Sequence, residues 1–401
     1  MAGRISVDEH AAFVRSLLAG LGARPSGRVA LADALGRITA SPVESPIALP
    51  PFRNSQMDGF AVHAVDVTDA PVSLPIAGEV AAAAGVPAPL AAGTAVRIMT
   101  GAAVPDGADA VVPVEDTEPD GAGDGDRVRI LRARAAGEYV REAGSDLAAG
   151  ADVLPAGLKL ASRHLAAAAA SGLTELFVRE RVRIAVVSTG SELVPPGSTL
   201  GPGEIPDANG VALAAAARAA GAVVVHEARV RDDVGRLRAE LDAAREAGAE
   251  LVVTSGGVSK GAYEVVRELL EPLGAWVGSV AMQPGGPQAT AAYRGMPVVG
   301  FPGNPVSAQL SFELFVAPTL RAIAGLPPAA TERLELAEAL SSVPGKRQFL
   351  RGRRTDDGRA TVVGGPGSHL VAALAASDLL IVVPEGIESL DAGAVVDTVF
   401  L

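Results

Sequence analysis

Three glycine-rich segments, each preceded by a short apolar run, lie between about residues 183 and 305. They are Ser188–Leu193 (STGSEL), Thr254–Ser259 (TSGGVS) and Phe301–Pro305 (FPGNP). Parallel α/β sheets bind ligands just beyond the carboxyl ends of their strands, so we expect the three segments to meet in one crevice. Their backbone N–H groups and carboxylates suit a phosphorylated ligand together with a divalent metal ion.

Backbone N–H groups are the first chemical element of this crevice. Ser255, Gly256 and Gly257 can form a concave nest for an oxyanion, although the pattern is equally typical of an ordinary strand-to-helix turn. Asn304 and Pro305 have the types of a helix N-cap and the first helical position. N–H groups at such a helix start suit phosphate, and a plain helix start fits the same residues equally well.

Carboxylates are the second element. Glu192 belongs to the first glycine-rich segment, Asp232 and Asp233 follow a predicted strand, and Glu264 lies near the start of the helix after the glycine pair. Oxygen ligands beside phosphates suit Mg²⁺, which keeps several of its waters. For Asp232 the alternative is a helix N-cap.

Several well-known catalytic signatures are missing. The chain has no Walker-type phosphate loop, no strand-linked GxGxxG, no GxSxG nucleophile elbow and no HExxH zinc motif. It has no cysteine, which excludes disulfides, thiolate metal sites and cysteine nucleophiles. The five histidines are scattered, and only His369, beside Ser368 at a predicted helix start, has a suggestive setting.

Composition indicates a folded, multidomain protein that does not bind nucleic acid. The 401 residues exceed one ordinary core, so two to four domains are expected. A net charge of −12 and few aromatic residues argue against nucleic acid, so any anionic ligand must be held by local groups. We find no apolar stretch of membrane-spanning length and no signal peptide, and we expect a cytoplasmic location.

The elements that must position these residues begin near residue 180, where strands alternate with helices and predict a mostly parallel sheet. The expected strands are 184–187, 223–225, 251–254, 276–280 and 298–301, and the expected helices are 212–220, 234–247, 263–270 and 305–323.

The flanking regions have other patterns. A capping box at Ser6–Glu9 predicts a helix that ends by Gly20, and a second short helix is expected at 29–35. Residues 55–150 show short apolar runs between Gly/Pro turns, which indicates a separate β domain. The last 75 residues or so predict a small β-barrel or sandwich with one short helix near 369–376.

Several strings, in this order and spacing, resemble the MoeA family, which is similar to the E domain of gephyrin. The matching segments are Asn54–Val62, Arg97–Ala103, Asp106–Ala108, Ser188–Leu193, Asp207–Asn209, Arg231–Asp233, Ser255–Ser259, Gly300–Ala308, Phe349–Arg353 and Ser368–Leu370. The resemblance covers nearly the whole chain.

The resemblance implies a multidomain α/β plus β fold. Its centre is a three-layer α/β domain similar to the Mog and MoaB proteins, between an N-terminal β-rich domain and a C-terminal small β-barrel. The implied domains are a linking and dimerisation domain (1–45 with 145–178), an inserted β-rich domain (46–144), the α/β substrate domain (179–326) and the C-terminal barrel (327–401).

The resemblance also implies a function: insertion of molybdate into adenylylated molybdopterin with release of AMP, the last step of molybdenum cofactor synthesis, with Mg²⁺ as the metal. The implied catalytic residues are Asp58, Glu192, Asp232 and Glu264, and Glu192, Asp232 and Asp233 are the expected metal ligands. The expected substrate-binding residues are Thr100, Thr189, Gly190, Ser255, Gly256, Gly257, Ser259, Lys260, Pro302, Gly303, Asn304, Pro305, Arg351 and Ser368.

A homodimer is implied as well, with Asp58 and Thr100 of one subunit reaching the crevice of the other. A transient contact with a molybdopterin adenylyltransferase is a further expectation. The chain departs from the family at Gln283 and Gly286, where many relatives carry lysines. One alternative is therefore a catalytically weak pterin-binding scaffold. A second alternative is a molybdopterin adenylyltransferase, because the Mog-type enzymes resemble residues 180–325 alone.

Overall fold

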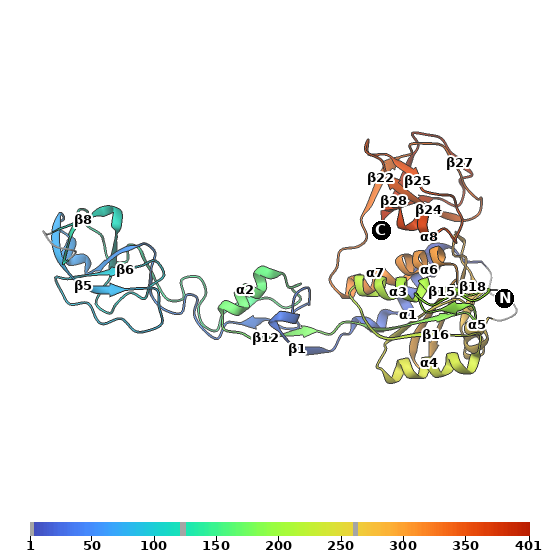
Figure 1. Ribbon diagram of the computed structural model, residues 1–401, viewed down its shortest axis with the longest axis horizontal. Helices are drawn as coiled ribbons and strands as arrows, with labels where there is room; N and C mark the ends of the chain where they lie inside the picture. Colours follow the sequence, from blue (N-terminus) through green and yellow to red (C-terminus); the bar gives the residue numbers. More distant parts are fainter. Residues whose placement is uncertain (1–3, 121–125, 260–263) are drawn as a thin grey trace. The chain divides into compact units, whose positions relative to one another are not determined.

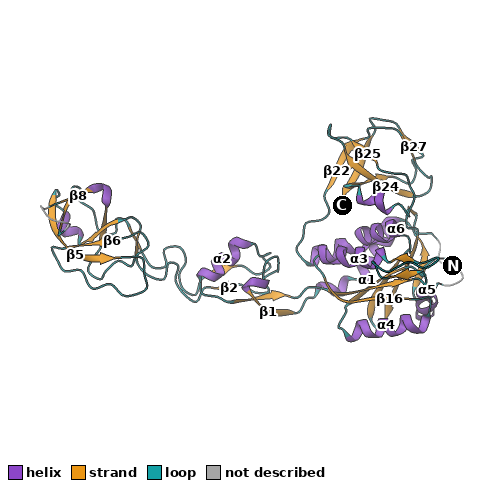
Figure 2. Ribbon diagram, in the orientation of Figure 1, coloured by secondary structure: helices purple, strands orange, loops and turns teal. Residues whose placement is uncertain are grey.

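The computed structural model describes residues 4–120, 126–259 and 264–401, which form two compact units (Figures 1 and 2). One unit contains Met1–Pro25 and Glu180–Leu401, and the other contains Ser26–Arg179. Separate hydrophobic clusters lie in the α/β region, the β-rich insert, the linking region and the C-terminal region.

A six-stranded sheet organises the α/β domain, in the order β16-β13-β17-β21-β20-β18. Four of its strands form three parallel pairs, and β20 alone runs antiparallel to its neighbours. The strands are β16 (Val223–Val230), β13 (Arg183–Thr189), β17 (Leu251–Ser255), β21 (Met296–Phe301), β20 (Pro287–Tyr293) and β18 (Trp276–Ser279). The mostly parallel sheet is confirmed, and β20 is a strand that the sequence pattern did not predict.

Helices cover both faces of this sheet and complete three layers (Figure 1). Hydrophobic contacts place α1, α3, α6 and α7 on one face and α4 and α5 on the other. Their bounds are α1 (Val7–Leu17), α3 (Ala208–Ala219), α6 (Pro305–Ser311), α7 (Ala317–Ile323), α4 (Val234–Glu246) and α5 (Val265–Leu270). The predicted start of α5 at Tyr263 lies outside the described residues.

The predicted helix 305–323 contains a π-helical turn, Phe312–Val316, between α6 and α7. Pro318 lies in the first turn of α7 and has no N–H for a bond to the preceding turn. A π turn accommodates the unpaired carbonyl while the chain continues as a helix.

The N-terminal helix α1 packs in the α/β unit. Its capping box is confirmed: the N–H of Ser6 donates to Glu9 Oε2 at 2.7 Å, and the N–H of Glu9 donates to Ser6 Oγ at 3.1 Å. The first 25 residues therefore differ from the expectation that grouped residues 1–45 with 145–178.

The helix predicted at 29–35 is wrong. Residues Ser26–Ala30 form strand β1, which pairs antiparallel with β12 (Glu175–Arg179), and only Leu31–Asp33 is a 3₁₀ turn. The partner strand lies about 150 positions away, so local periodicity could not reveal the pairing. The linking region also contains β2 (Val43–Glu44), β11 (Asp152–Leu154) and α2 (Ser162–Ala170).

The β-rich insert is a six-stranded sheet in the order β7-β4-β6-β5-β9-β8. Its strands are β7 (Ala110–Pro113), β4 (Gly59–Val62), β6 (Ala95–Ile98), β5 (Val72–Val80), β9 (Arg127–Ile130) and β8 (Thr117–Pro119), and β3 (Asn54–Ser55) pairs with β10 (Val140–Arg141) beside it. The β-rich character expected for residues 55–150 is confirmed.

The C-terminal strands curl into a small barrel, as predicted. The sheet runs β19-β24-β26-β28-β22, β25 pairs with β24, and a bridge between Leu336 and Ala360 joins β25 to the end of β22. The bounds are β19 (Met282–Gln283), β24 (Arg347–Arg354), β26 (Leu379–Val383), β28 (Val395–Phe400), β22 (Thr331–Glu335) and β25 (Ala360–Val362), with α8 at Val371–Ala375. Within the described residues, no helix is long and apolar enough to cross a membrane.

Candidate active site

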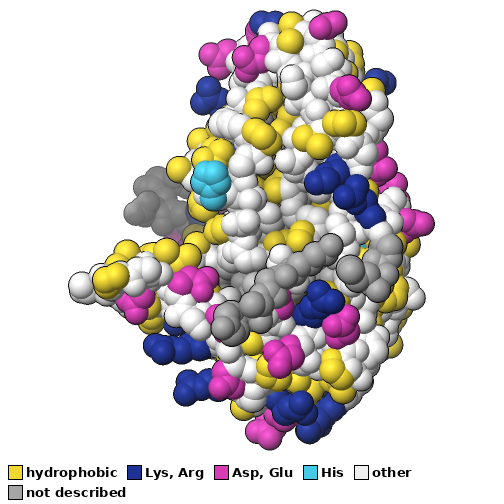
Figure 3. All heavy atoms as spheres, turned by 90° about the vertical axis from the view of Figure 1, so that its right-hand side faces the viewer, with side chains coloured by type: hydrophobic (Ala, Val, Ile, Leu, Met, Phe, Trp, Pro, Cys, Tyr) yellow, Lys and Arg dark blue, Asp and Glu magenta, His cyan; other side chains and the backbone are white. Residues whose placement is uncertain are grey.

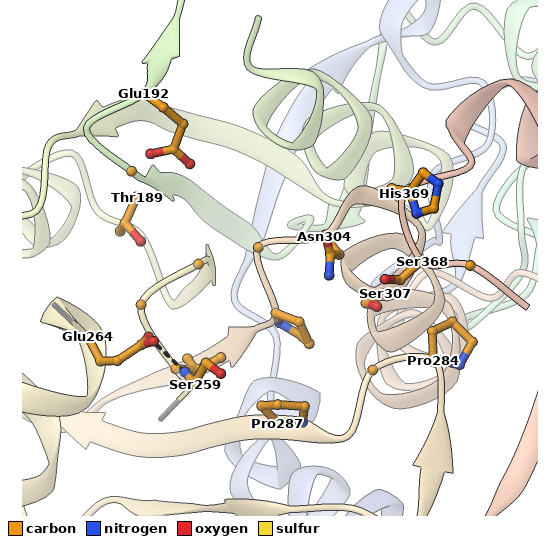
Figure 4. A pocket seen from close by; sticks show the side chains of 18 of the residues that line it. Thr189, Glu192, Ser259, Glu264, Pro284, Pro287, Asn304, Ser307, Ser368 and His369 are labelled. Carbon is orange, nitrogen blue, oxygen red and sulfur yellow. Dashed lines mark hydrogen bonds between the residues drawn. The ribbon is translucent and has the colours of Figure 1, made fainter. Parts of the chain in front are cut away.

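The three glycine-rich segments converge as predicted, at the carboxyl ends of β13, β17 and β21. They surround a crevice of about 640 Å³ in the α/β unit (Figure 4). Its lining also includes His369, the one histidine with a suggestive sequence setting, and residues outside the expected catalytic and substrate-binding sets: Val258, Gln283, Pro284, Gly285, Pro287, Ser307, Pro366 and Gly367. Predicted residues in the lining are Thr189, Gly190, Glu192, Asp232, Gly256, Gly257, Ser259, Glu264, Pro302, Gly303, Asn304 and Ser368.

The first two turns touch each other through their backbones at Gly256 and Gly257. Both glycines have left-handed φ angles, 87° and 67°. A Cβ at Gly256 would lie 2.5 Å from the carbonyl oxygen of Thr189, and one at Gly257 would lie 3.0 Å from the N–H nitrogen of Val266. Only glycine fits here, because any side chain would separate the two turns.

This close packing leaves a nest of backbone donors. Among the described residues, the N–H groups of Gly257 and Val258 have no hydrogen-bond partner, and neither do those of Gly303 and Asn304 across the crevice. Successive free N–H groups in a left-handed turn form a concave anion site. The nest interpretation is thus favoured over an ordinary turn, and Ser259 is held beside it because its N–H donates to Glu264 Oε2 at 2.7 Å.

Two further carboxylates line the crevice beside the first glycine-rich turn. Glu192 is exposed, and its side chain folds back over Gly190 (Figure 4). Asp232 accepts a hydrogen bond from the N–H of Ser191 at 3.1 Å. The N-cap of α4 is Asp233, whose Oδ1 accepts from the N–H of Arg236 at 2.8 Å. The capping role therefore belongs to the second aspartate of the pair and not to Asp232.

The predicted metal trio of Glu192, Asp232 and Asp233 does not form. Asp233 caps its helix and does not line the crevice. Within the described residues, no group of three or more histidine, aspartate or glutamate side chains is close enough to hold a metal ion. Magnesium commonly uses one or two protein carboxylates and completes its shell with substrate phosphates and water, which is the donor set that Glu192 and Asp232 can offer.

The third segment differs in detail from the prediction. Pro305 starts α6 outside the lining, and the N–H of Val306 is occupied by the carbonyl of Ser368 at 3.2 Å. Ser255 is 1% exposed and lies beneath the crevice with Ser188, so it cannot contact substrate directly. Lys260 lies outside the described residues.

Arg351 is not a lining residue, contrary to its predicted contact with an oxyanion. It is 2% exposed, and its guanidinium donates to the carbonyl of Gly367 at 3.0 Å and to that of Gly365. Burial lowers the pKa of Arg351, because the charged form loses its hydration. The side chain thus holds, from behind, the loop that presents Ser368 and His369 to the crevice (Figure 4).

The crevice has an unusual charge balance for an anion site. Three carboxylates line it (Glu192, Asp232 and Glu264), and within the described residues His369 is the only lining side chain that can become positive. Figure 3 shows basic and acidic side chains interspersed over one face of the molecule. Backbone N–H groups must therefore contribute most of the attraction for anions.

Asp58 and Thr100 lie together in the β-rich insert. Asp58 Oδ1 accepts hydrogen bonds from both the N–H and the hydroxyl of Thr100, each at 2.7 Å, and these bonds lower the pKa of Asp58. The residue after Asp58 must be glycine, because a Cβ at Gly59 would lie 2.0 Å from the carbonyl oxygen of Val112. The pair is thus a fixed, ionised and exposed group.

Comparisons with known proteins cover nearly the whole chain. Family models match at residues 5–172, "MoeA N-terminal region (domain I and II)", at residues 185–322, "Probable molybdopterin binding domain", and at residues 333–401, "MoeA C-terminal region (domain IV)". The chain is 43% identical to molybdopterin molybdenumtransferase 2 of Mycobacterium tuberculosis, over 97% of each chain. It is 36% identical to molybdopterin molybdenumtransferase 1 of the same organism, over 99% of each.

A solved structure agrees with these matches. The crystal structure of a molybdopterin biosynthesis MoeA protein from Pyrococcus horikosii aligns with a TM-score of 0.79 and 32% identity, over 99% of both chains. The family models, the curated relatives and the solved structure thus indicate the same family. The chain belongs to the MoeA family of molybdopterin molybdenumtransferases.

Proposed function

We propose that this enzyme inserts molybdate into adenylylated molybdopterin and releases AMP, and that the reaction takes place in the crevice of the α/β unit. The names of its relatives, molybdopterin molybdenumtransferases, support molybdenum transfer to molybdopterin. The observation that carries the assignment to this crevice is that free N–H groups at Gly257, Val258, Gly303 and Asn304 and three carboxylates line the same crevice.

The substrate's pyrophosphate is the group that this pairing suits best. N–H groups of the nest bind phosphate oxygens and stabilise the charge that develops when the phosphoanhydride bond is cleaved. Bound Mg²⁺, held by Glu192 and Asp232, would neutralise charge on the phosphates. The dithiolene sulfurs that receive molybdenum belong to the substrate, so the enzyme needs no cysteine.

Glu192 is the residue that we assign to the water that cleaves the phosphoanhydride. It is exposed in the crevice, and within the described part of the chain its side chain makes no hydrogen bond or ion pair. Water adds to phosphorus as the bond to the leaving phosphate oxygen breaks, and a carboxylate at this position can accept the proton. We do not assign Glu264 to this water, because its Oε2 already accepts a hydrogen bond from the N–H of Ser259.

Purified enzyme tests the reaction in two arms. One arm supplies adenylylated molybdopterin, molybdate and Mg²⁺, and the other supplies molybdopterin and ATP. AMP release in the first arm supports the proposal. Tight binding without turnover would instead identify a pterin-binding scaffold, and attachment of AMP in the second arm would identify an adenylyltransferase.

We also propose that the enzyme works as a cytoplasmic homodimer, with Asp58 of one subunit serving the crevice of its mate, and that it receives substrate in a transient contact with an adenylyltransferase. Mixing two inactive variants, Asp58→Asn and Glu192→Gln, tests the dimer. In mixed dimers one of the two sites has both residues intact, so mixing should restore part of the activity. Activity that stays absent after subunit exchange would contradict a shared site.

A further inference from the structure

A second hollow adjoins the crevice at Gly190. It has a volume of about 350 Å³, and it is lined by Gly190, Leu193, Arg229, Val230, Arg231, Arg236, Ala239 and Glu240. Gly190 lines both this hollow and the crevice. Three arginines thus gather beside a crevice in which no described lining residue is a lysine or an arginine.

Two of these arginines carry unpaired charge. Within the described residues, the side chains of Arg231 and Arg236 are exposed and have no hydrogen-bond or ion-pair partner. Arg229 is fixed in place, because its Nε donates to Asp207 Oδ2 at 3.2 Å. The hollow therefore has one anchored guanidinium and two that are available to a ligand.

The nearby carboxylates are already occupied. Glu240 lies 2.8 Å from His226 Nε2, and Asp207 also accepts from the N–H of Gly210 at 2.9 Å. Asp233 is bonded to the backbone N–H of Arg236. None of these pairings uses the guanidinium of Arg231 or Arg236, so an anion that enters the hollow meets two cations that are free to bind it.

We propose that this hollow, the arginine pocket, is a binding site for a tetrahedral oxyanion, either a phosphate group of a nucleotide or an inorganic dianion. Guanidinium groups bind such oxyanions through paired, charge-assisted hydrogen bonds. Leu193, Val230 and Ala239 add an apolar wall, and the volume is within the range of small-ligand sites. The protein as a whole has a charge of −12, so a local cluster is what can draw an anion toward the crevice.

The proposal goes beyond the proposed function and depends on it only for the choice of AMP and molybdate as probes. Calorimetric titrations at low salt would measure the binding of AMP, adenosine, inorganic phosphate and molybdate to the wild type, to Arg231→Gln, to Arg236→Gln and to the double variant. Arg238→Gln is the matched control, because it removes the same charge at an exposed position outside the pocket, from the helix that also carries Arg236.

Loss of one charge-assisted contact should weaken anion binding at least about tenfold in each single variant and further in the double variant. Adenosine should not bind detectably. AMP binding more tightly than phosphate would identify a nucleotide as the source, and equal or tighter binding of phosphate or molybdate would identify an inorganic anion. Both results support the pocket.

Affinities that stay at the wild-type value in the double variant, or fall equally in Arg238→Gln, would overturn the proposal. The result is separable from the proposed function. If molybdenum insertion cannot be detected, binding that depends on Arg231 and Arg236 still establishes the pocket. If insertion proceeds and binding is unchanged, the pocket alone is refuted.

Discussion

Replacing Gly256 with alanine is the most informative small change to the crevice. The new Cβ would lie 2.5 Å from the carbonyl oxygen of Thr189, whereas ordinary van der Waals contact begins at 3.4 Å. The two turns would have to separate by about 0.9 Å (3.4 − 2.5) to accept it. A displacement of about 1 Å among catalytic groups costs on the order of 100-fold in rate, so kcat/KM for molybdate-dependent AMP release should fall by that order.

Backbone strain must be separated from this displacement. Gly256 has a φ of 87°, and an alanine there is strained by roughly 1–2 kcal/mol whatever its surroundings. Gly203 provides a matched control, because its φ is 80° and no atom lies within 4 Å of its added Cβ. Both variants should show the loss of stability that comes from the strained backbone, Gly256→Ala should lose more because of its close contact with Thr189, and only Gly256→Ala should lose turnover. Equal turnover in the two variants would show that the turns at Gly190 and Gly256 do not frame the catalytic site.

Three further changes test other parts of the account. Glu192→Gln should abolish AMP release and leave adenylylated molybdopterin bound, which equilibrium binding and a turnover assay can show together; normal turnover would remove Glu192 from the mechanism. Arg351→Met should raise the KM for molybdate about tenfold or more, because two charge-assisted bonds to the loop of Ser368 are lost. The protein should not lose comparable stability, because the buried charge of Arg351 has no carboxylate partner among the described residues. An unchanged KM would contradict the positioning role of Arg351. Burial lowers the pKa of His10 to about 4, so as the pH falls below about 6.5 the unfolded chain takes up a proton before the folded chain does. Between pH 6.5 and 4, the free energy of unfolding of the wild type should therefore fall by up to about 3 kcal/mol more than that of His10→Phe. Parallel curves of unfolding free energy against pH would refute this.

The pH prediction depends on the surroundings of His10. Its side chain is fully buried, and neither ring nitrogen has a hydrogen-bond partner. The ring centroid lies 4.6 Å from that of Phe315 and 5.0 Å from that of Trp276. Phenylalanine should fit among these rings without the ionisable group, which makes it the appropriate replacement.

The convergence of the crevice could be predicted because it follows from sheet topology. Apolar runs followed by glycine-rich segments marked β13, β17 and β21, and parallel strands bring such segments to one edge. The antiparallel strand β20 was missed because its sequence, PQATAAY, contains a proline and three alanines, which do not favour strands. β1 was predicted as a helix because its pairing partner is distant in sequence.

The roles of individual side chains were less predictable. Adjacent aspartates at 232 and 233 have equal capping propensity, and only the backbone geometry shows that Asp233 is the cap. Arg351 carries a charge that normally stays at the surface, so its burial behind the Gly365–Gly367 loop depends on tertiary packing. The arginine pocket could not be predicted, since Arg231 was noted only as part of the Arg231–Asp233 segment, and no spacing pattern links it to Arg229 and Arg236.

The most direct test of the central claim is a crystal structure of the Glu192→Gln variant with adenylylated molybdopterin, prepared without molybdate. The account predicts electron density for the pyrophosphate within hydrogen-bonding distance of the N–H groups of Gly257 and Val258, facing Asp232. Density for the substrate at another surface, with water alone in the crevice, would contradict it.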